Sequence, residues 1–125
     1  TTREGRGAKF PDLTLILRDG SQHKRIAVEL ELSKKNYDRC KKMMLSYSNK
    51  SDIDVVIYIA EQKGIFDQIA RAMKEINYPS WERPVGFSHL KDWETNPMNA
   101  PIYLSNGVFS LNDWINPKKE VLTIS

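Results

Sequence analysis

Residues 11–35 read PDLTLILRDGSQHKRIAVELELSKK. Two apolar segments, residues 13–17 and 26–32, stand on either side of a polar stretch, residues 18–22, in which Asp-Gly is the strongest turn signal. The first segment is a short apolar run, and the second alternates between apolar and other residues. This pattern predicts two antiparallel strands joined by a hairpin turn.

Helices and strands are expected to alternate after the hairpin. The apolar spacing predicts helices over residues 34–48, with Ser33 as the N-cap, and over residues 63–76. Residues 53–60 are almost continuously apolar, as in a strand covered on both faces. Short strands are expected at 85–88, 102–104 and 108–110, and a helical turn at 90–94. This order of hairpin, helix, strand, helix and strand predicts an α/β fold with a central mixed sheet flanked by helices.

The 125 residues correspond to one domain, in which residues 1–9 form a tail or an incoming loop. With 40% hydrophobic and 28% charged residues and no apolar run near the ~20 needed to cross a bilayer, the chain is expected to be cytoplasmic and free of membrane partners. The single cysteine, Cys40, excludes an internal disulfide and is expected to be buried. A net charge of +3 permits an anionic partner. The chain starts with Thr rather than Met and has no signal-peptide pattern, so we expect it to be part of a longer protein.

Acidic residues gather at one end of the predicted hairpin. Because side chains alternate between the faces of a strand, Glu29 and Glu31 share a face with Ala27. The turn brings Asp12 across from residues 27–31, so Asp12, Glu29 and Glu31 are expected to converge. Three carboxylates at one point repel one another unless a cation lies among them, and hard oxygen ligands suit Mg²⁺ or Mn²⁺. Such an ion polarises a phosphoryl oxygen and lowers the pKa of bound water.

These residues resemble the motif of the PD-(D/E)xK nuclease superfamily. Pro11-Asp12 is followed by Glu29-Leu30-Glu31 at a separation usual for that motif. The resemblance implies a restriction-endonuclease-like core and assigns the metal to Asp12 and Glu29. Glu31 occupies the position of the motif's lysine, which departs from the pattern. Some members carry Glu-x-Glu there, and others recruit a lysine from the following helix, for which Lys34 or Lys35 is available.

The chain is also similar to the replication-relaxation proteins of bacterial plasmids and conjugative elements. Beyond the two acidic motifs, the similarity includes a lysine-bearing helix from Lys41 to Tyr47 and the apolar strand Val56-Ile57-Tyr58-Ile59. In that family such a domain often follows a winged-helix segment. The similarity implies a DNA-processing role in plasmid replication or conjugative transfer, with DNA and other replication or transfer proteins as partners.

Each of these features has a second interpretation. The carboxylates form a metal site, a solvated strand face, or a superfamily site that has lost its metal. The basic residues form either a DNA-backbone surface or a solvated helix face; they are Lys34, Lys35, Arg39, Lys41 and Lys42. Two functions therefore stay open. One is metal-dependent phosphodiester hydrolysis by the three carboxylates and Lys34 or Lys35. The other is a catalytically inactive module for DNA binding or assembly on the same fold.

Aromatic residues are frequent in the second half of the chain. They either pack a core or offer a platform on which nucleic-acid bases stack; they are Trp81, Trp93, Tyr103, Phe109 and Trp114.

Overall fold

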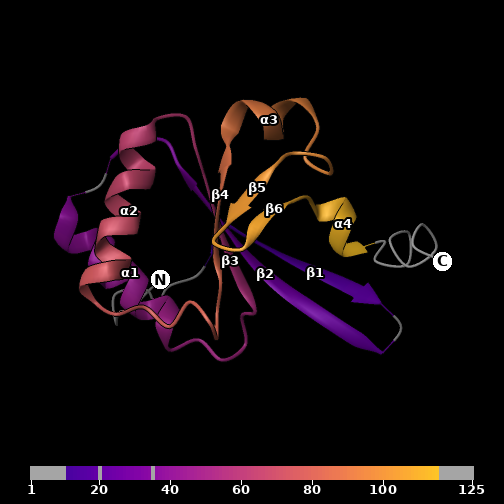
Figure 1. Ribbon diagram of the computed structural model, residues 1–125, viewed down its shortest axis with the longest axis horizontal. Helices are drawn as coiled ribbons and strands as arrows, with labels where there is room; N and C mark the ends of the chain where they lie inside the picture. Colours follow the sequence, from indigo (N-terminus) through magenta and orange to yellow (C-terminus); the bar gives the residue numbers. More distant parts are fainter. Residues whose placement is uncertain (1–10, 20, 35, 116–125) are drawn as a thin grey trace.

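A computed structural model describes residues 11–19, 21–34 and 36–115 (Figure 1). Within these residues the chain forms six strands and four helices. In chain order they are β1 (Leu13–Asp19), β2 (Gln22–Glu31), α1 (Tyr37–Ser48), β3 (Val55–Ala60), α2 (Lys63–Glu75), β4 (Val85–His89), α3 (Leu90–Thr95), β5 (Ile102–Leu104), β6 (Gly107–Phe109) and α4 (Leu111–Ile115). The expected tail or incoming loop, residues 1–9, lies outside the described residues.

The six strands form one mixed sheet in the order β1-β2-β3-β4-β5-β6. β2, β3 and β4 are parallel to one another, whereas β1 is antiparallel to β2, and β5 is antiparallel to both β4 and β6. The connections from β2 to β3 and from β3 to β4 each contain a helix, because parallel neighbouring strands require a crossover connection. The predicted α/β class, the hairpin and the order of the elements are thus confirmed.

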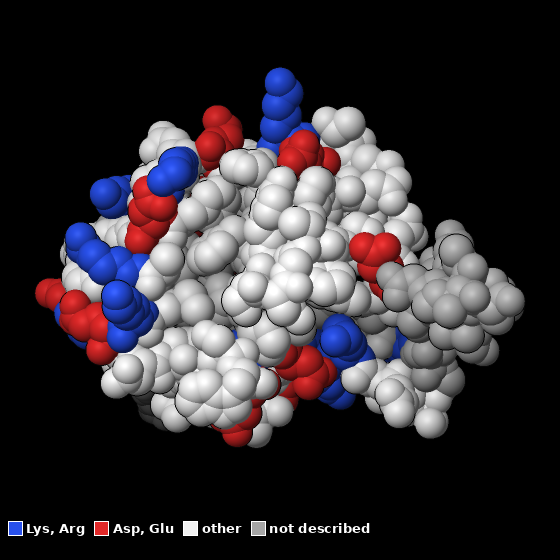
Figure 2. All heavy atoms as spheres, in the orientation of Figure 1, with Lys and Arg blue, Asp and Glu red and all other residues white. Residues whose placement is uncertain are grey.

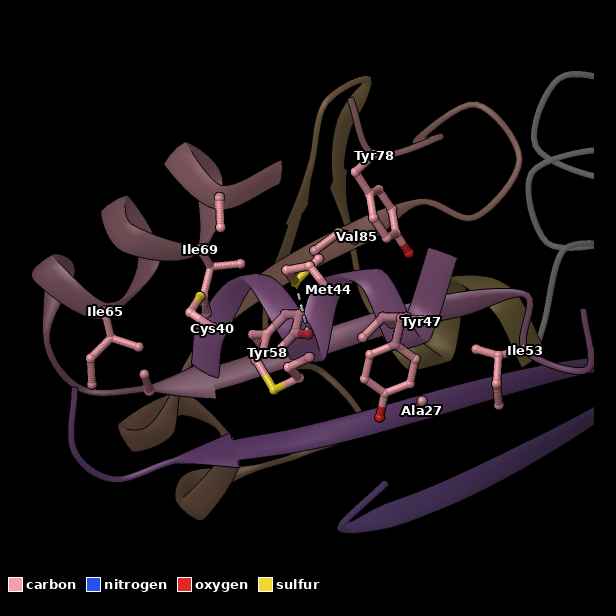
Figure 3. Packing of buried hydrophobic residues seen from close by; sticks show 14 residues of the cluster. Ala27, Cys40, Met44, Tyr47, Ile53, Tyr58, Ile65, Ile69, Tyr78 and Val85 are labelled. Carbon is pink, nitrogen blue, oxygen red and sulfur yellow. Dashed lines mark hydrogen bonds between the residues drawn. The ribbon is translucent and has the colours of Figure 1, made fainter. Parts of the chain in front are cut away.

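Helices lie on both faces of the sheet. α1 and α2 cover one face and enclose the larger hydrophobic cluster, which includes Met44, Tyr58 and Ile69 (Figures 1 and 3). The opposite face carries a smaller cluster formed with Trp93 of α3 and with Leu111 and Trp114 of α4. β3 lies between these layers, and all six of its residues are buried, as its apolar sequence predicts.

Helix α1 begins three residues later than the sequence suggests. Its N-cap is Asn36, whose Oδ1 accepts a hydrogen bond of 2.9 Å from the backbone N–H of Arg39. The prediction of Ser33 as the cap was wrong because both residue types cap helices well, and only the three-dimensional path of the chain selects one. As a consequence, Lys34 precedes the helix instead of lying in its first turn.

The aromatic residues of the second half of the chain differ in burial. Trp93 and Trp114 pack against the smaller core cluster, and the Nε1–H of Trp93 donates a 2.6 Å hydrogen bond to Ser88 Oγ. Trp81 and Tyr103 are exposed, by 84% and 44%. Cys40 is buried, as expected. None of the described helices is both long enough and apolar enough to cross a lipid bilayer.

Candidate functional site

The β1–β2 hairpin brings Asp12 and Glu29 together. Leu13 pairs with Val28 in the antiparallel register, so Asp12, one residue earlier, lies at the position opposite Glu29. Asp12 Oδ2 accepts a hydrogen bond of 2.8 Å from the backbone N–H of Leu30, which fixes the carboxylate beside β2. We refer to Asp12 and Glu29 as the acid pair. Its two members differ in environment, because Asp12 is exposed whereas Glu29 is only 1% exposed.

Tyr47 of α1 contacts the buried member of this pair. Its hydroxyl group donates a hydrogen bond to Glu29 Oε2, and Figure 3 shows the ring pointing from α1 toward β2. Burial is the main cause that raises the pKa of the Tyr47 hydroxyl above its usual value, followed by the hydrogen bond to Glu29 and by the charges of Glu29 and Asp12. The hydroxyl therefore stays protonated and acts as a donor. A buried carboxylate needs such a partner, because removing it from water is otherwise costly.

A buried arginine fixes the end of α1 that carries Tyr47. Arg83 Nη1 donates to the carbonyl oxygens of Tyr47 and Ser48, at 3.0 and 3.1 Å, and its Nε donates to Ile53 O at 2.8 Å. These carbonyl groups include two at the C-terminal end of the helix, which have no partner within it. Arg83 comes from the loop between α2 and β4, so it ties this loop to the helix and holds Tyr47 over β2.

Glu31 lies on the same face of β2, but in different surroundings. It is 4% exposed and lines a cavity of about 10 Å³ between α1 and α2, together with Cys40, Met43 and Gln68. A cavity of this size holds about one water molecule, which is too little for a hydrated divalent cation. Glu31 therefore lies in a confined space beside α1 and α2.

The donor set of the acid pair fits a hard divalent cation. Within the described residues, no group of three or more His, Cys, Asp or Glu side chains lies close enough together to hold a metal ion. Mg²⁺, however, is usually bound by one or two carboxylates, several waters and the phosphate oxygens of a substrate. Asp12, just before β1, and Glu29 of β2 supply two carboxylates, one of them exposed, which meets this requirement.

The basic residues around α1 fall into two groups. Lys34, Arg39 and Lys42 are exposed, whereas Lys35 lies outside the described residues. Lys41 is half-buried, and its Nζ lies 2.7 Å from Glu75 Oε2 of α2. Figure 2 shows acidic and basic side chains mixed on the side where α1 and α2 lie. The surface of α1 therefore offers separate cations rather than a continuous basic stripe.

Lys41 joins the two helices on this face. Glu75 accepts hydrogen bonds from Lys41 and from the hydroxyl group of Tyr37, at 2.7 and 3.0 Å. The hydrogen bond from Lys41 is the main cause that lowers the pKa of Glu75, and the same bond raises the pKa of Lys41. The Tyr37 ring also lies 4.1 Å from the guanidinium carbon of Arg71. These contacts assign Lys41 to the packing of α1 against α2.

Another cleft opens at the carboxyl ends of β3 and β4, along the edge of the sheet at which β2 also ends. It has a volume of about 570 Å³, and its charged lining consists of Glu61, Lys91, Asp92 and Glu94. Ligands of open α/β sheets often bind at such an edge. Three carboxylates against one lysine repel a phosphate group, however, so this cleft does not suit an anionic substrate.

Comparison of the chain with models of protein families, with curated proteins and with solved structures finds no match in any of the three.

Proposed function

We propose that this chain is a nuclease-like DNA-processing domain of a mobile genetic element, in which Asp12 and Glu29 bind Mg²⁺ or Mn²⁺ for phosphodiester hydrolysis. The observation that carries the proposal is the position of Asp12 opposite a buried Glu29 at one end of the hairpin. A buried carboxylate lowers stability unless it is compensated, and such groups concentrate at functional sites. The restriction-endonuclease-like core belongs to the same proposal, supported by the sequence of hairpin, helix and parallel strand.

The chain's own residues have distinct roles in this proposal. Asp12, being exposed, faces the substrate side, while Glu29 is held below it by Tyr47. When bound, the cation supplies Lewis-acid polarisation of a phosphate oxygen and acidifies bound water. Lys34 is exposed just before α1 and offers a charge for a neighbouring phosphate. Lys35 and Glu31, expected from the motif to assist, have weaker support: Lys35 lies outside the described residues and Glu31 is packed between α1 and α2.

A plasmid-nicking assay with Mg²⁺ or Mn²⁺ tests the proposal, using Asp12→Asn and Glu29→Gln. Both substitutions keep an oxygen that accepts the hydrogen bond from Leu30 N–H or from Tyr47, so the fold is expected to survive. We expect each to reduce nicking by at least about 100-fold, as expected for loss of a metal ligand or its support. The matched control is Glu82→Gln, an exposed acid in the loop before β4. Nicking that persists in both acid-pair variants would contradict the proposal.

A second candidate function is a catalytically inactive module that binds DNA or assembles replication or transfer proteins. It is favoured by Glu31, which takes the place of the motif's lysine and is enclosed by Cys40 and Met43. This function needs basic residues but no metal. It therefore predicts binding to duplex DNA in the presence of a chelator, with an affinity that falls steeply as salt rises, and no nicking by any variant.

A further inference from the structure

The outer edge of β1 has the features of an interaction surface. β1 stands at one end of the sheet, and among the described strands it pairs with β2 alone. It is seven residues long, whereas β6 at the other end of the sheet has three. A long edge strand presents unpaired backbone N–H and C=O groups, which pair readily with a further strand. Two of its apolar side chains are also exposed, Leu13 by 49% and Ile16 by 45%.

The hairpin register shows which backbone groups of β1 point outward. The N–H of Leu30 points to the β1 side of β2, where it donates to Asp12. Val28, two residues earlier, points the same way, and its register partner is Leu13. Because backbone groups alternate in direction along a strand, the odd-numbered residues of β1 bond to β2. The even-numbered residues, which direct their N–H and C=O groups to the open edge, are Thr14, Ile16 and Arg18.

An antiparallel pairing of β1 with β1 of a second copy matches opposite charges. When Leu15 lies opposite Leu15 of the second copy, Thr14 lies opposite Ile16, and Asp12 lies opposite Arg18 on both sides of the two-fold axis. Asp12 and Arg18 are both exposed and lie on the same face of the strand. Opposite charges that face each other directly favour a register. A shift by two residues places either Arg18 opposite Thr14 or Asp12 opposite Ile16, so the match is lost.

The same register also joins apolar side chains on the other face of β1. Leu13, Leu15 and Leu17 share this face, and the last two pack against the smaller core cluster. In the paired strands, Leu13 of each copy lies opposite Leu17 of the other. The row of leucines therefore continues from one copy to the next, and the exposed Leu13 gains an apolar neighbour.

We infer that two copies of the chain form a dimer by antiparallel pairing of β1 with β1, about a two-fold axis at Leu15. The two sheets then become one continuous sheet. Such an interface uses the same surface on both copies, so it closes and does not extend into a fibre. Arg18 of each copy lies beside Asp12 of the other, so each acid pair borders on the second copy. This pairing needs neither metal nor DNA and does not depend on the proposed function.

Analytical ultracentrifugation over a series of protein concentrations, without metal or DNA, tests the dimer. The variants are Arg18→Glu, Asp12→Lys and the double variant. Each single substitution places like charges opposite each other at both ends of the paired strands, and the double variant restores opposite charges. The matched control Lys74→Glu makes the same change of charge as Arg18→Glu at an exposed position on α2. Urea unfolding verifies that every variant is folded.

We expect the wild type to dimerise reversibly within about 1–100 μM, as for an interface at the lower end of the usual size range. The dissociation constant should rise at least about tenfold in each single variant and return to within about threefold of wild type in the double variant. The control should match the wild type. Arg18→Glu leaves the hydrogen bond between Asp12 and Leu30 in place, so its result decides even where Asp12→Lys weakens the fold.

Three outcomes would overturn the inference. A wild type that stays monomeric throughout the concentration range would leave the edge of β1 to another occupant, such as a strand of a different protein. A dimer that Arg18→Glu weakens no more than the control would place the interface on another surface. A folded double variant no better than the single variants would exclude the register with Asp12 opposite Arg18. In each case the nicking assay decides separately whether the acid pair is active.

Discussion

A tyrosine and a buried glutamate form the central contact of the molecule. Tyr47 and Glu29 are fully or almost fully removed from solvent, and the hydroxyl group of one donates to the carboxylate of the other. A second buried tyrosine, Tyr58, lies on β3, the strand next to β2. Its hydroxyl group donates a hydrogen bond to Met44 Sδ at 3.1 Å. Because a thioether is a weak acceptor, the two hydroxyl groups have different energetic importance.

Replacing Tyr47 by Phe should therefore destabilise the protein more than replacing Tyr58 by Phe. Loss of the Tyr47 hydroxyl leaves a buried carboxylate oxygen without this donor, which costs about 2–3 kcal/mol, whereas loss of the Tyr58 hydroxyl costs about 1 kcal/mol or less. Urea denaturation of the two variants measures the difference. Equal effects would mean that the hydrogen bond between Tyr47 and Glu29 contributes little.

Buried tyrosines also make the fold sensitive to alkali. Burial raises the pKa of Tyr58 well above its usual value, and burial raises the pKa of Tyr78 to about 12, although the nearby Arg83 opposes that increase. Below pH 10 these hydroxyl groups are neutral in both the folded and the unfolded chain. Above pH 10 the unfolded chain loses protons that the folded chain keeps, so the free energy of unfolding should fall.

Urea unfolding at about pH 8 and about pH 11 checks this expectation. In Tyr78→Phe the free energy of unfolding should decrease less between these pH values, because the variant lacks one of the hydroxyl groups whose pKa is higher in the folded chain. A free energy of unfolding that is constant between the two pH values would contradict the assignment of buried, protonated tyrosines.

At the scale of the element, the two ends of α1 determine where its side chains lie. Asn36 caps the first turn, and Arg83 binds carbonyl groups of the last turn. Between these ends the helix places Tyr47 over β2 and Lys41 against Glu75. If the helix started at Ser33 instead, Lys34 would lie within it and would approach phosphate from a fixed direction.

Substitution of the cap residues distinguishes the two starts of the helix. Asn36→Ala should cost about 1 kcal/mol, because the backbone N–H of Arg39 loses its acceptor. Ser33→Ala should change the free energy of unfolding by less than about 0.5 kcal/mol, the range of ordinary surface substitutions. Thermal or urea denaturation of both variants gives the comparison, and the opposite ranking would restore Ser33 as the cap.

Strands β1 to β3 and helices α1 and α2 could be predicted because their apolar patterns extend over many residues. Helix α4 was missed, since a helix of five residues is too short for a periodic pattern. A local signal existed nonetheless: Ser110 and Asp113 have the spacing of a capping box, and the side chain of each accepts a hydrogen bond from the backbone N–H of the other.

The position of Asp12 opposite Glu29 could also be predicted from local sequence patterns. The turn position and the alternation of β2 together fix the register, and a slip of one residue would move Glu29 to the opposite face. The contacts of Glu29 with Tyr47 and of Tyr47 with Arg83 were not predictable, because they join residues far apart in the chain. The confined surroundings of Glu31 likewise depend on how α1 and α2 pack over β2.

At the scale of the whole molecule, the hairpin forms one edge of the sheet in a three-layered body and carries the acid pair at one end. The acid pair lies at the end of the hairpin that leads into α1. The turn at the other end lies beside α4 (Figure 1). The acidic cleft lies at the carboxyl ends of β3 and β4, along the same edge of the sheet as the carboxyl end of β2. The proposed metal site would therefore lie along β1 and β2, with α1 and α2 as support.

Nicking of supercoiled plasmid by wild type and by Glu29→Gln, with Mg²⁺ or Mn²⁺ and at equal protein stability, tests the central claim most directly. We expect metal-dependent nicking by wild type, abolished by chelator and reduced at least about 100-fold in the variant. Wild-type protein that does not nick DNA with either metal, or a Glu29→Gln variant as active as wild type, would contradict the assignment of Asp12 and Glu29 as a catalytic metal site.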